Sequence, residues 1–103
     1  MINLLKYKFM VEFKLPEQMS QEYLNLIPSH KLKVKNYFDQ NILQSYTLAY
    51  NLRKLWAVFL ANSKEDVIKY IDELPLSKYM SYEIHELMFH EVSDALIPSF
   101  SLN

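Results

Sequence analysis

The sequence predicts an α+β fold whose elements follow the order strand, helix, strand, strand, helix, strand. Three observations lead to this class. Residues 6–15, KYKFMVEFKL, alternate apolar and polar side chains with the period of two that is typical of a strand. Residues 20–41 and 63–74 instead repeat apolar side chains every three or four positions, as amphipathic helices do. One Leu-Pro pair follows the first strand and another follows the second helix, where proline's missing backbone donor ends each element.

The first strand carries one apolar face and one mixed face. Side chains two apart in a strand point to the same side, so the aromatic residues gather on one face and the charged residues on the other. Pro16 ends the strand because it cannot donate a hydrogen bond to a neighbouring strand. The apolar face comprises Tyr7, Phe9, Val11, Phe13 and Leu15, and the mixed face comprises Lys6, Lys8, Met10, Glu12 and Lys14.

The first helix begins after Ser20, whose hydroxyl is a good N-cap. Pro28 interrupts the helical pattern, so it either kinks the helix or occupies the first turn of a second segment. Asn41 readily adopts the left-handed conformation and can replace the C-terminal glycine that this chain lacks. The predicted buried stripe consists of Tyr23, Ile27, His30, Val34 and Phe38.

Residues 42–50 and 54–61 predict two strands joined by a hairpin or a short loop. The segment 54–61, KLWAVFLA, is apolar on both faces, which is typical of a central strand. Ser63 then begins a second helix, and the last strand spans residues 80–89. The apolar stripe of the second helix consists of Val67, Ile68, Ile71 and Leu74.

This order is that of a ferredoxin-like βαββαβ fold with an antiparallel four-stranded sheet. Two helices cover only one face of such a sheet, and Trp56 or Phe59 must lie on the other face. Because monomers seldom expose a large apolar patch, we expect this face to pack on the same face of a second subunit or to cover a ligand. A two-fold homodimer is the simplest closed assembly.

Length and composition narrow the class of protein. The 103 residues predict a single domain, 1–103, in which 91–103 form a C-terminal tail. A net charge of −1 and a pI near 6.3 argue against a general nucleic-acid binder. The absence of cysteine and glycine excludes a thiol nucleophile, a cysteine-bound metal and a glycine-rich phosphate loop. No signal peptide or membrane-length apolar segment is visible, so we expect a cytoplasmic protein with no membrane partner.

Two motifs give the chain a resemblance to a known family. Lys-Leu-Pro, two residues and Met end the first strand, and Leu-Pro-Leu, two residues and Tyr-Met precede the last strand. With these motifs the stretch from about Phe9 to Ser93 resembles muconolactone isomerase. Glu83, Leu87 and His90 also fall where that family has the same residue types. The motif positions are Lys14, Leu15, Pro16, Met19, Leu74, Pro75, Leu76, Tyr79 and Met80.

The resemblance implies a ferredoxin-like subunit whose sheet pairs with that of a second copy into a dimeric α+β barrel, from which larger rings are built. It implies an enzyme of aromatic catabolism that moves a proton within a small unsaturated lactone carrying a carboxylate, without a metal or an organic cofactor. The chain departs from the family in lacking glycines near the first helix end and the central hairpin, and residues 41–54 match poorly. These departures affect the substrate more than the fold.

Three residues on the first and last predicted strands are candidates for acid–base chemistry. A proton shift beside a carbonyl needs a general base, an acid and a group that stabilises the developing enolate. Glu83 and His85 lie two apart on one face of the last strand, where a carboxylate can set the tautomer of an imidazole. Glu12 on the mixed face of the first strand is a further candidate. The alternative for all three is a solvated edge residue or a cross-strand ion pair.

His30 and a set of binding residues complete the candidate site. His30 follows Pro28 by two residues, a pattern that resembles the YCII-related domains, in which the histidine points into the cleft. The alternative is a histidine satisfied at the edge of the core. Lys8 and Lys14 are candidates for binding a substrate carboxylate, and Trp56 for binding the substrate body, with packing as its alternative.

We therefore expect an isomerase-like protein that binds a small lactone or carboxylate and forms a homodimer or a larger homo-oligomer. A non-catalytic, ligand-binding dimeric barrel and a cofactorless monooxygenase on the same scaffold are the alternatives. We expect no cofactor and no metal. His85 and His90 are five apart on a strand and face opposite sides, so they cannot converge with His30 on one ion.

Overall fold

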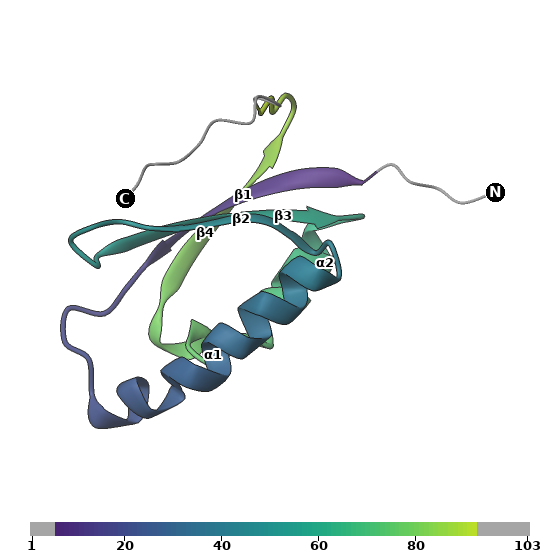
Figure 1. The fold of residues 1–103 in the computed structure, drawn as a ribbon. Helices are drawn as coiled ribbons and strands as arrows, with labels where there is room; N and C mark the ends of the chain where they lie inside the picture. The colour runs from purple at the N-terminus through teal and green to yellow at the C-terminus, as the bar shows by residue number, and fades with distance from the viewer. Residues whose placement is uncertain (1–5, 93–103) are drawn as a thin grey trace, which may run out of the picture.

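The chain folds into a four-stranded antiparallel sheet with two helices on one of its faces (Figure 1). The computed structural model describes residues 6–92. The sheet order β2-β3-β1-β4 confirms the ferredoxin-like βαββαβ prediction. None of the helices within the described residues is long and apolar enough to cross a membrane. The elements are β1 (Tyr7–Lys14), α1 (Gln21–Asp39), β2 (Leu43–Leu48), β3 (Lys54–Ala61), α2 (Lys64–Asp72), the 3-10 helix η1 (Ser77–Tyr79) and β4 (Ser81–Leu87).

The two central strands, β1 and β3, set which side chains lie on each face of the sheet. Cross-strand partners point to the same side, so one register defines both faces. The face that the helices cover, which we call the helix face, carries Phe9, Val11 and Phe13 of β1 opposite Phe59, Ala57 and Leu55 of β3. The other face, which we call the open face, carries Lys8, Met10, Glu12 and Lys14 opposite Leu60, Val58, Trp56 and Lys54.

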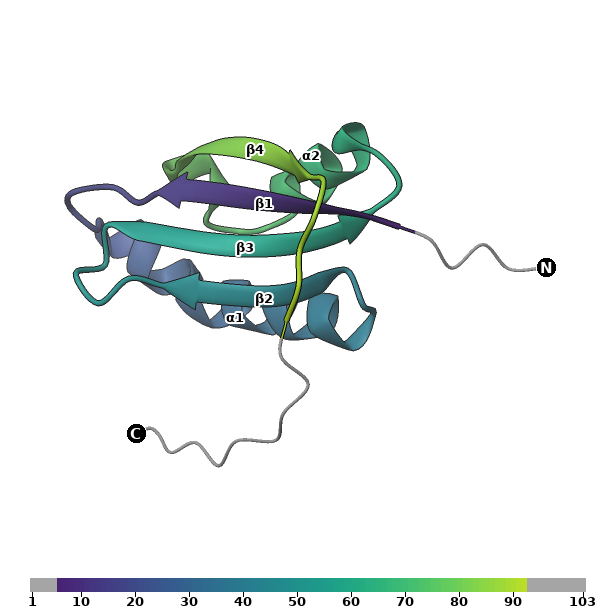
Figure 2. The same cartoon turned by 90° about the horizontal axis from the view of Figure 1, so that it is seen from above.

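A bulge in β2 adjusts which of its side chains reach the helix face. The pairing advances two residues along β2, from Leu43 to Ser45, while it advances one residue along β3. Leu43 consequently shares the helix face with Tyr46 and Leu48, which simple alternation would not allow. The β2–β3 hairpin predicted from the sequence is confirmed, with β3 in a central position (Figure 2).

α1 is one continuous helix although it contains Pro28. The alternative in which Pro28 starts a second segment is therefore wrong. The missing donor leaves the carbonyl of Leu24 without its helical partner, and Leu24 lies exposed, where water can satisfy the group. Ser20 caps the helix as predicted, accepting a hydrogen bond from the Tyr23 N–H at 3.1 Å. The buried stripe ends at Tyr37 rather than Phe38, whose side chain is exposed.

α2 forms as its capping residue and apolar stripe predict. Ser63 accepts a hydrogen bond from the Asp66 N–H at 3.1 Å. Val67 and Ile71 are fully buried, while Ile68 is only half-buried. The helix ends at Asp72, shortly before the second Leu-Pro pair, so the proline lies outside the helix as expected.

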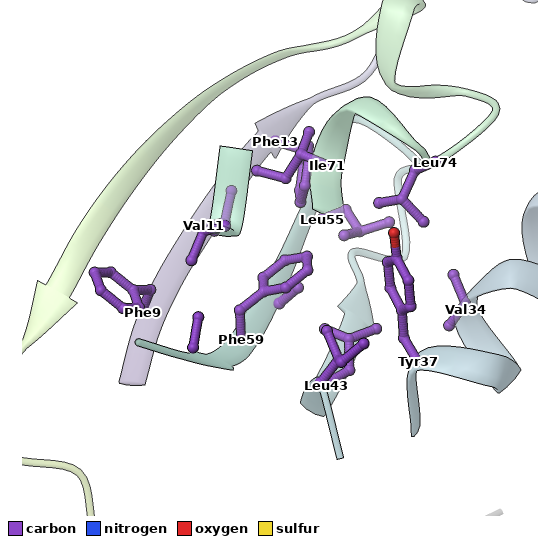
Figure 3. Close-up of a cluster of buried hydrophobic side chains, with 14 of the residues drawn as sticks. Phe9, Val11, Phe13, Val34, Tyr37, Leu43, Leu55, Phe59, Ile71 and Leu74 are labelled. Carbon is purple, nitrogen blue, oxygen red and sulfur yellow. The ribbon is translucent and has the colours of Figure 1, made fainter. Parts of the chain in front are cut away.

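Aromatic side chains join α1 and α2 to β3 on the helix face, and Figure 3 shows two of them, Tyr37 of α1 and Phe59 of β3. The Tyr37 ring lies 6.4 Å from that of Phe59 and 5.6 Å from that of Tyr70. Tyr70 stacks on Phe59 with ring centroids 6.5 Å apart. The Tyr37 hydroxyl also donates a 2.6 Å hydrogen bond to the backbone carbonyl of Tyr70. The C-terminal half of α1 is thereby held against both α2 and the sheet.

Two residues without glycine's freedom adopt the left-handed backbone conformation. Asn41 has φ of 60°, which confirms the predicted turn after α1. Leu52 has φ of 63° in the β2–β3 hairpin, where its N–H donates to the Ala49 carbonyl at 2.9 Å. A leucine in this conformation brings its Cβ too close to the carbonyl oxygen. The hairpin therefore carries local strain at Leu52.

We expect the Leu52→Gly variant to be more stable than Leu52→Ala by about 0.5–1 kcal/mol, because glycine has no Cβ penalty at positive φ and loses only part of this gain to entropy. Urea unfolding followed by fluorescence of the single tryptophan, Trp56, measures the difference. The same pair of substitutions at the exposed Tyr50 is the control, where alanine should equal or exceed glycine. A Leu52→Gly protein that is less stable than Leu52→Ala would contradict the strain.

Candidate functional site

A cavity of about 490 Å³ lies between the N-terminal half of α1 and the helix face of the sheet. Figure 1 shows α1 close to the sheet at its C-terminal end and farther from it toward its N-terminal end. Side chains of the N-terminal half therefore enclose space instead of meeting the strands directly. Most of the wall is apolar and includes Ile27 and Val34 of α1, Leu48 of β2, Leu55 of β3, and Leu76 and Met80.

The polar groups of the cavity are few and come from two elements. Tyr23, His30 and Lys31 belong to α1, and Tyr46 belongs to β2. His30 is buried, with 5% of its surface exposed. Lys31 is exposed and borders the cavity beside it. A mostly apolar pocket with a small number of convergent polar groups is typical of a small-molecule site.

Both ring nitrogens of His30 have hydrogen-bond partners. Its Nδ1 accepts a hydrogen bond from the backbone N–H of Leu76 at 3.2 Å. Its Nε2 lies 2.7 Å from the hydroxyl oxygen of Tyr46. These partners come from the segment after α2 and from β2, so His30 ties three parts of the chain together. A buried polar side chain with its partners present costs little stability, while a single lost partner would cost about 1–3 kcal/mol.

Burial governs the protonation of these groups. Desolvation lowers the pKa of His30 from 6.5 to about 4, because the charged imidazolium loses its water. Burial raises the pKa of Tyr46, and the nearby Tyr23 raises it further. Burial likewise raises the pKa of Tyr23. At neutral pH the cavity therefore presents a neutral imidazole and neutral hydroxyl groups.

The predicted acid–base residues Glu12, Glu83 and His85 lie together on the open face, opposite the cavity. Glu12 of β1 is the cross-strand partner of Glu83, and Met10 is the partner of His85. His85 Nε2 lies 3.5 Å from the Glu83 carboxylate. The structure thus brings the three predicted residues together in one patch, because β1 and β4 are neighbours and all three side chains point to the open face.

Solvent dominates the electrostatics of this open-face group. The Glu12 carboxylate forms a 2.9 Å ion pair with Lys54, and that hydrogen bond lowers the pKa of Glu12. The side chains of Glu83 and His85 are 79% and 57% exposed. A hollow of about 170 Å³ bounded by Glu12, Lys14 and Glu83 is the concave part of the patch. Water and salt screen such exposed charges, so this group is a weaker acid–base site in one copy of the chain than an enclosed one.

The predicted binding residues also lie on the open face, away from His30. Trp56 stands between Thr47 and Glu12 in its cross-strand row. Lys8 pairs with Leu60 and Leu87, and Lys14 pairs with Lys54 and Ser81. Lys14 also borders a second, polar hollow of about 660 Å³, which Arg53, Lys54 and Lys78 share. His30 is thus the only predicted site residue that lines the cavity.

The structure adds Tyr46 and Leu76 to the residues that sequence reasoning identified. One sequence signal could have identified Tyr46: it lies two residues before Leu48 in the same predicted strand, so both side chains had to point to the same face. Nothing local pointed to the pairing of Tyr46 or Leu76 with His30. Among residues 6–92, no group of three or more His, Asp or Glu side chains is placed to hold a metal ion.

Comparison with known proteins supports the fold. No protein-family model matches the chain, and no relative is found among the curated proteins. A crystal structure of muconolactone isomerase at 3.3 Å resolution matches with a TM-score of 0.68 and 22% identity, over 87% of this chain and 97% of that chain. A crystal structure of MtbAldR matches with a TM-score of 0.56 and 10% identity, over 89% of this chain and 59% of that chain. The resemblance predicted from the two motifs is confirmed at the level of the fold.

The pKa of His30 makes stability depend on acidity in a defined window. The unfolded chain binds a proton at His30 near pH 6.5, whereas the folded chain does so only near pH 4. The stabilisation is therefore complete above pH 6.5 and is lost progressively as the pH falls toward 4, by roughly 3 kcal/mol in total. Urea unfolding at several pH values in this window measures it.

His30→Gln is the test variant for this dependence. Its amide oxygen can accept from Leu76 and its amide nitrogen can donate to Tyr46, but it does not titrate. We expect this variant to lose the His30 share of the acid destabilisation. If the free energy of unfolding fell equally with pH in wild type and in His30→Gln, a buried, neutral His30 would be contradicted.

Proposed function

We propose that this protein catalyses a proton shift in a small unsaturated lactone or a related carbonyl compound, bound in the cavity under α1. The observation that carries the proposal is the cavity itself. Its walls are mostly apolar, and the hydrogen-bonded side chains of His30 and Tyr46 line it together. In such a shift a proton leaves a carbon near the carbonyl and returns to another carbon, while negative charge develops on the carbonyl oxygen. A fixed hydroxyl beside that oxygen stabilises the charge.

Size and charge agree with a small organic ligand. A volume of about 490 Å³ lies within the usual range of small-molecule pockets, which is roughly 300–1,000 Å³. Lys31 is the one lysine or arginine among the described residues that line the cavity. Its ammonium group can attract a substrate carboxylate at the entrance, while the apolar walls receive the carbon skeleton. The match to the fold of muconolactone isomerase supports this class of substrate.

Filling the cavity should abolish turnover. We expect purified protein to isomerise muconolactone, with the reaction followed by ultraviolet absorbance, and Ile27→Trp to lower kcat/KM at least about tenfold by occupying the site. Leu24→Trp places the same ring on the exposed side of α1 and should leave the rate unchanged. Well-folded wild-type protein with no activity above buffer would remove the muconolactone assignment.

A second candidate function is ligand binding without turnover. One observation favours it: among the described residues that line the cavity, none is a carboxylate. A proton shift needs a base, and the neutral His30 already uses both ring nitrogens in hydrogen bonds. A small acid or carbonyl compound that binds in the cavity and is recovered unchanged would establish this function in place of the first.

We further propose that a second copy of the chain covers the open face. Met10, Trp56 and Leu60 form an apolar strip there, and they are only partly buried within one copy. A two-fold pairing of these faces would enclose Glu12, Glu83 and His85, which would then lie out of bulk water. Catalysis by this open-face group rests on such a pairing, since enclosure strengthens its electrostatics. Glu12→Ala and His85→Ala should lower turnover only if the chemistry takes place there.

Sedimentation tests the pairing directly. We expect the wild-type protein to sediment at twice the chain mass of 12.4 kDa or at a multiple of that dimer. Leu60→Lys should yield a monomer, because a charge buried in the proposed interface would lose its water without gaining a partner. Leu24→Lys, on the exposed side of α1, is the matched control. A wild-type monomer at all concentrations would contradict the pairing.

A further inference from the structure

The backbone around His30 determines which of its nitrogens carries the proton. The Leu76 N–H can only donate, and it points at Nδ1 at a distance of 3.2 Å. Nδ1 must therefore be the unprotonated nitrogen, because a proton there would face the Leu76 proton. A neutral imidazole carries its single proton on the other nitrogen. Nε2 of His30 is consequently a donor.

This tautomer fixes the direction of the next hydrogen bond. Nε2–H of His30 donates to the Tyr46 hydroxyl oxygen, which lies 2.7 Å away. A phenol hydroxyl accepts on one side and donates its own proton on the other. The Tyr46 proton has no acceptor among the hydrogen bonds of the described residues, and Tyr46 lines the cavity. The cavity thus contains a hydroxyl whose proton is free for a ligand.

We propose that Tyr46 donates a hydrogen bond to an oxygen of the bound ligand, that this oxygen belongs to a planar conjugated enolate or phenolate, and that His30 is the positioning residue. The proposal rests on the proposed function in one respect, namely that the cavity binds a ligand. Three donors in sequence, from Leu76 through His30 to Tyr46, all point toward the ligand. Each hydrogen bond polarises the next, so the Tyr46 proton is a stronger donor than that of an isolated phenol.

The apolar wall explains why the anion should be delocalised. A compact carboxylate would lose most of its hydration in this cavity and would find one hydroxyl in return. An enolate or phenolate spreads its charge over a carbon framework that the apolar wall can contact, and its oxygen needs fewer donors. Such an oxygen is also what a proton shift beside a carbonyl generates. A ligand with a carboxylate would keep that group at the cavity entrance beside Lys31.

Two probes separate the oxygen contact from the filling of the cavity. 4-Nitrophenol in mildly alkaline solution supplies a phenolate, and 4-nitrotoluene supplies nearly the same shape without the charged oxygen. Titration of wild-type protein should show both bound, with the phenolate preferred. Tyr46→Phe should bind 4-nitrotoluene as before and lose phenolate affinity by about tenfold or more, which is typical of one hydrogen bond to a charged group. Lys31 is unchanged in this variant, so its attraction for the anion cancels in the comparison.

The visible absorption of bound phenolate tests the positioning role of His30. A hydrogen bond to the phenolate oxygen moves the absorption band to shorter wavelength, and this signal does not follow from stability alone. We expect phenolate bound to wild type and to His30→Gln to absorb at shorter wavelength than phenolate bound to Tyr46→Phe, because His30→Gln preserves the direction of both hydrogen bonds. In His30→Leu the band of bound phenolate should lie between the bands in wild type and Tyr46→Phe, and this variant should still bind 4-nitrotoluene.

The outcomes distinguish this inference from the proposed reaction. Equal phenolate affinity and equal spectra for wild type and Tyr46→Phe would overturn the role of Tyr46 while leaving the cavity as a binding site. If wild type bound neither probe, both the inference and the assignment of the cavity as a binding site would be overturned. A phenolate preference that depends on Tyr46, in a protein that does not turn over muconolactone, would support the inference and reject the reaction.

Discussion

The antiparallel pairing of β1 with β3 is the constraint on which the rest of the structure depends. Its register places Phe9, Val11 and Phe13 under the helices and Lys8 and Glu12 on the opposite face. A slip by one residue would bury the two charged side chains and expose the aromatic ones, at a cost far above the stability of a small domain. β2 and β4 add to the outer edges of this pair, so they inherit its division into two faces.

The cavity follows from how α1 is attached to that sheet. Tyr37 and Val34 hold the C-terminal half of α1 in the core. The N-terminal half contacts the rest of the chain through Tyr23, whose ring packs against that of Tyr79, and through the hydrogen bonds of His30. A buried histidine needs partners for both nitrogens, and Leu76 and Tyr46 supply them. The same two hydrogen bonds that make the histidine tolerable also define a polar site in an otherwise apolar space. Stability and a capacity for binding thus depend on the same contacts.

The two faces of the sheet offer different chemistry from similar residue types. His30 lies buried, where desolvation keeps it neutral. His85 lies beside the exposed Glu83, where water screens the interaction of the pair. Neutral hydrogen bonding in a low-dielectric space is directional and persists at any ionic strength, whereas exposed charge pairs weaken with salt. Which face performs the function therefore depends on what covers the open face.

The sequence by itself determined the elements and, for β1 and β4, the division of side chains between the two faces. Period-two alternation around Val11, the caps at Ser20 and Ser63 and the two Leu-Pro pairs are local signals, because neighbouring residues decide them. The sequence singled out His30, but the tertiary structure alone decided its partners in the candidate site. Tyr46 is 16 residues from His30, and Leu76 is 46 residues from it. The pairing of β2 with β3 and the placement of the segment after α2 bring these groups to His30, and no local pattern encodes a contact across that distance.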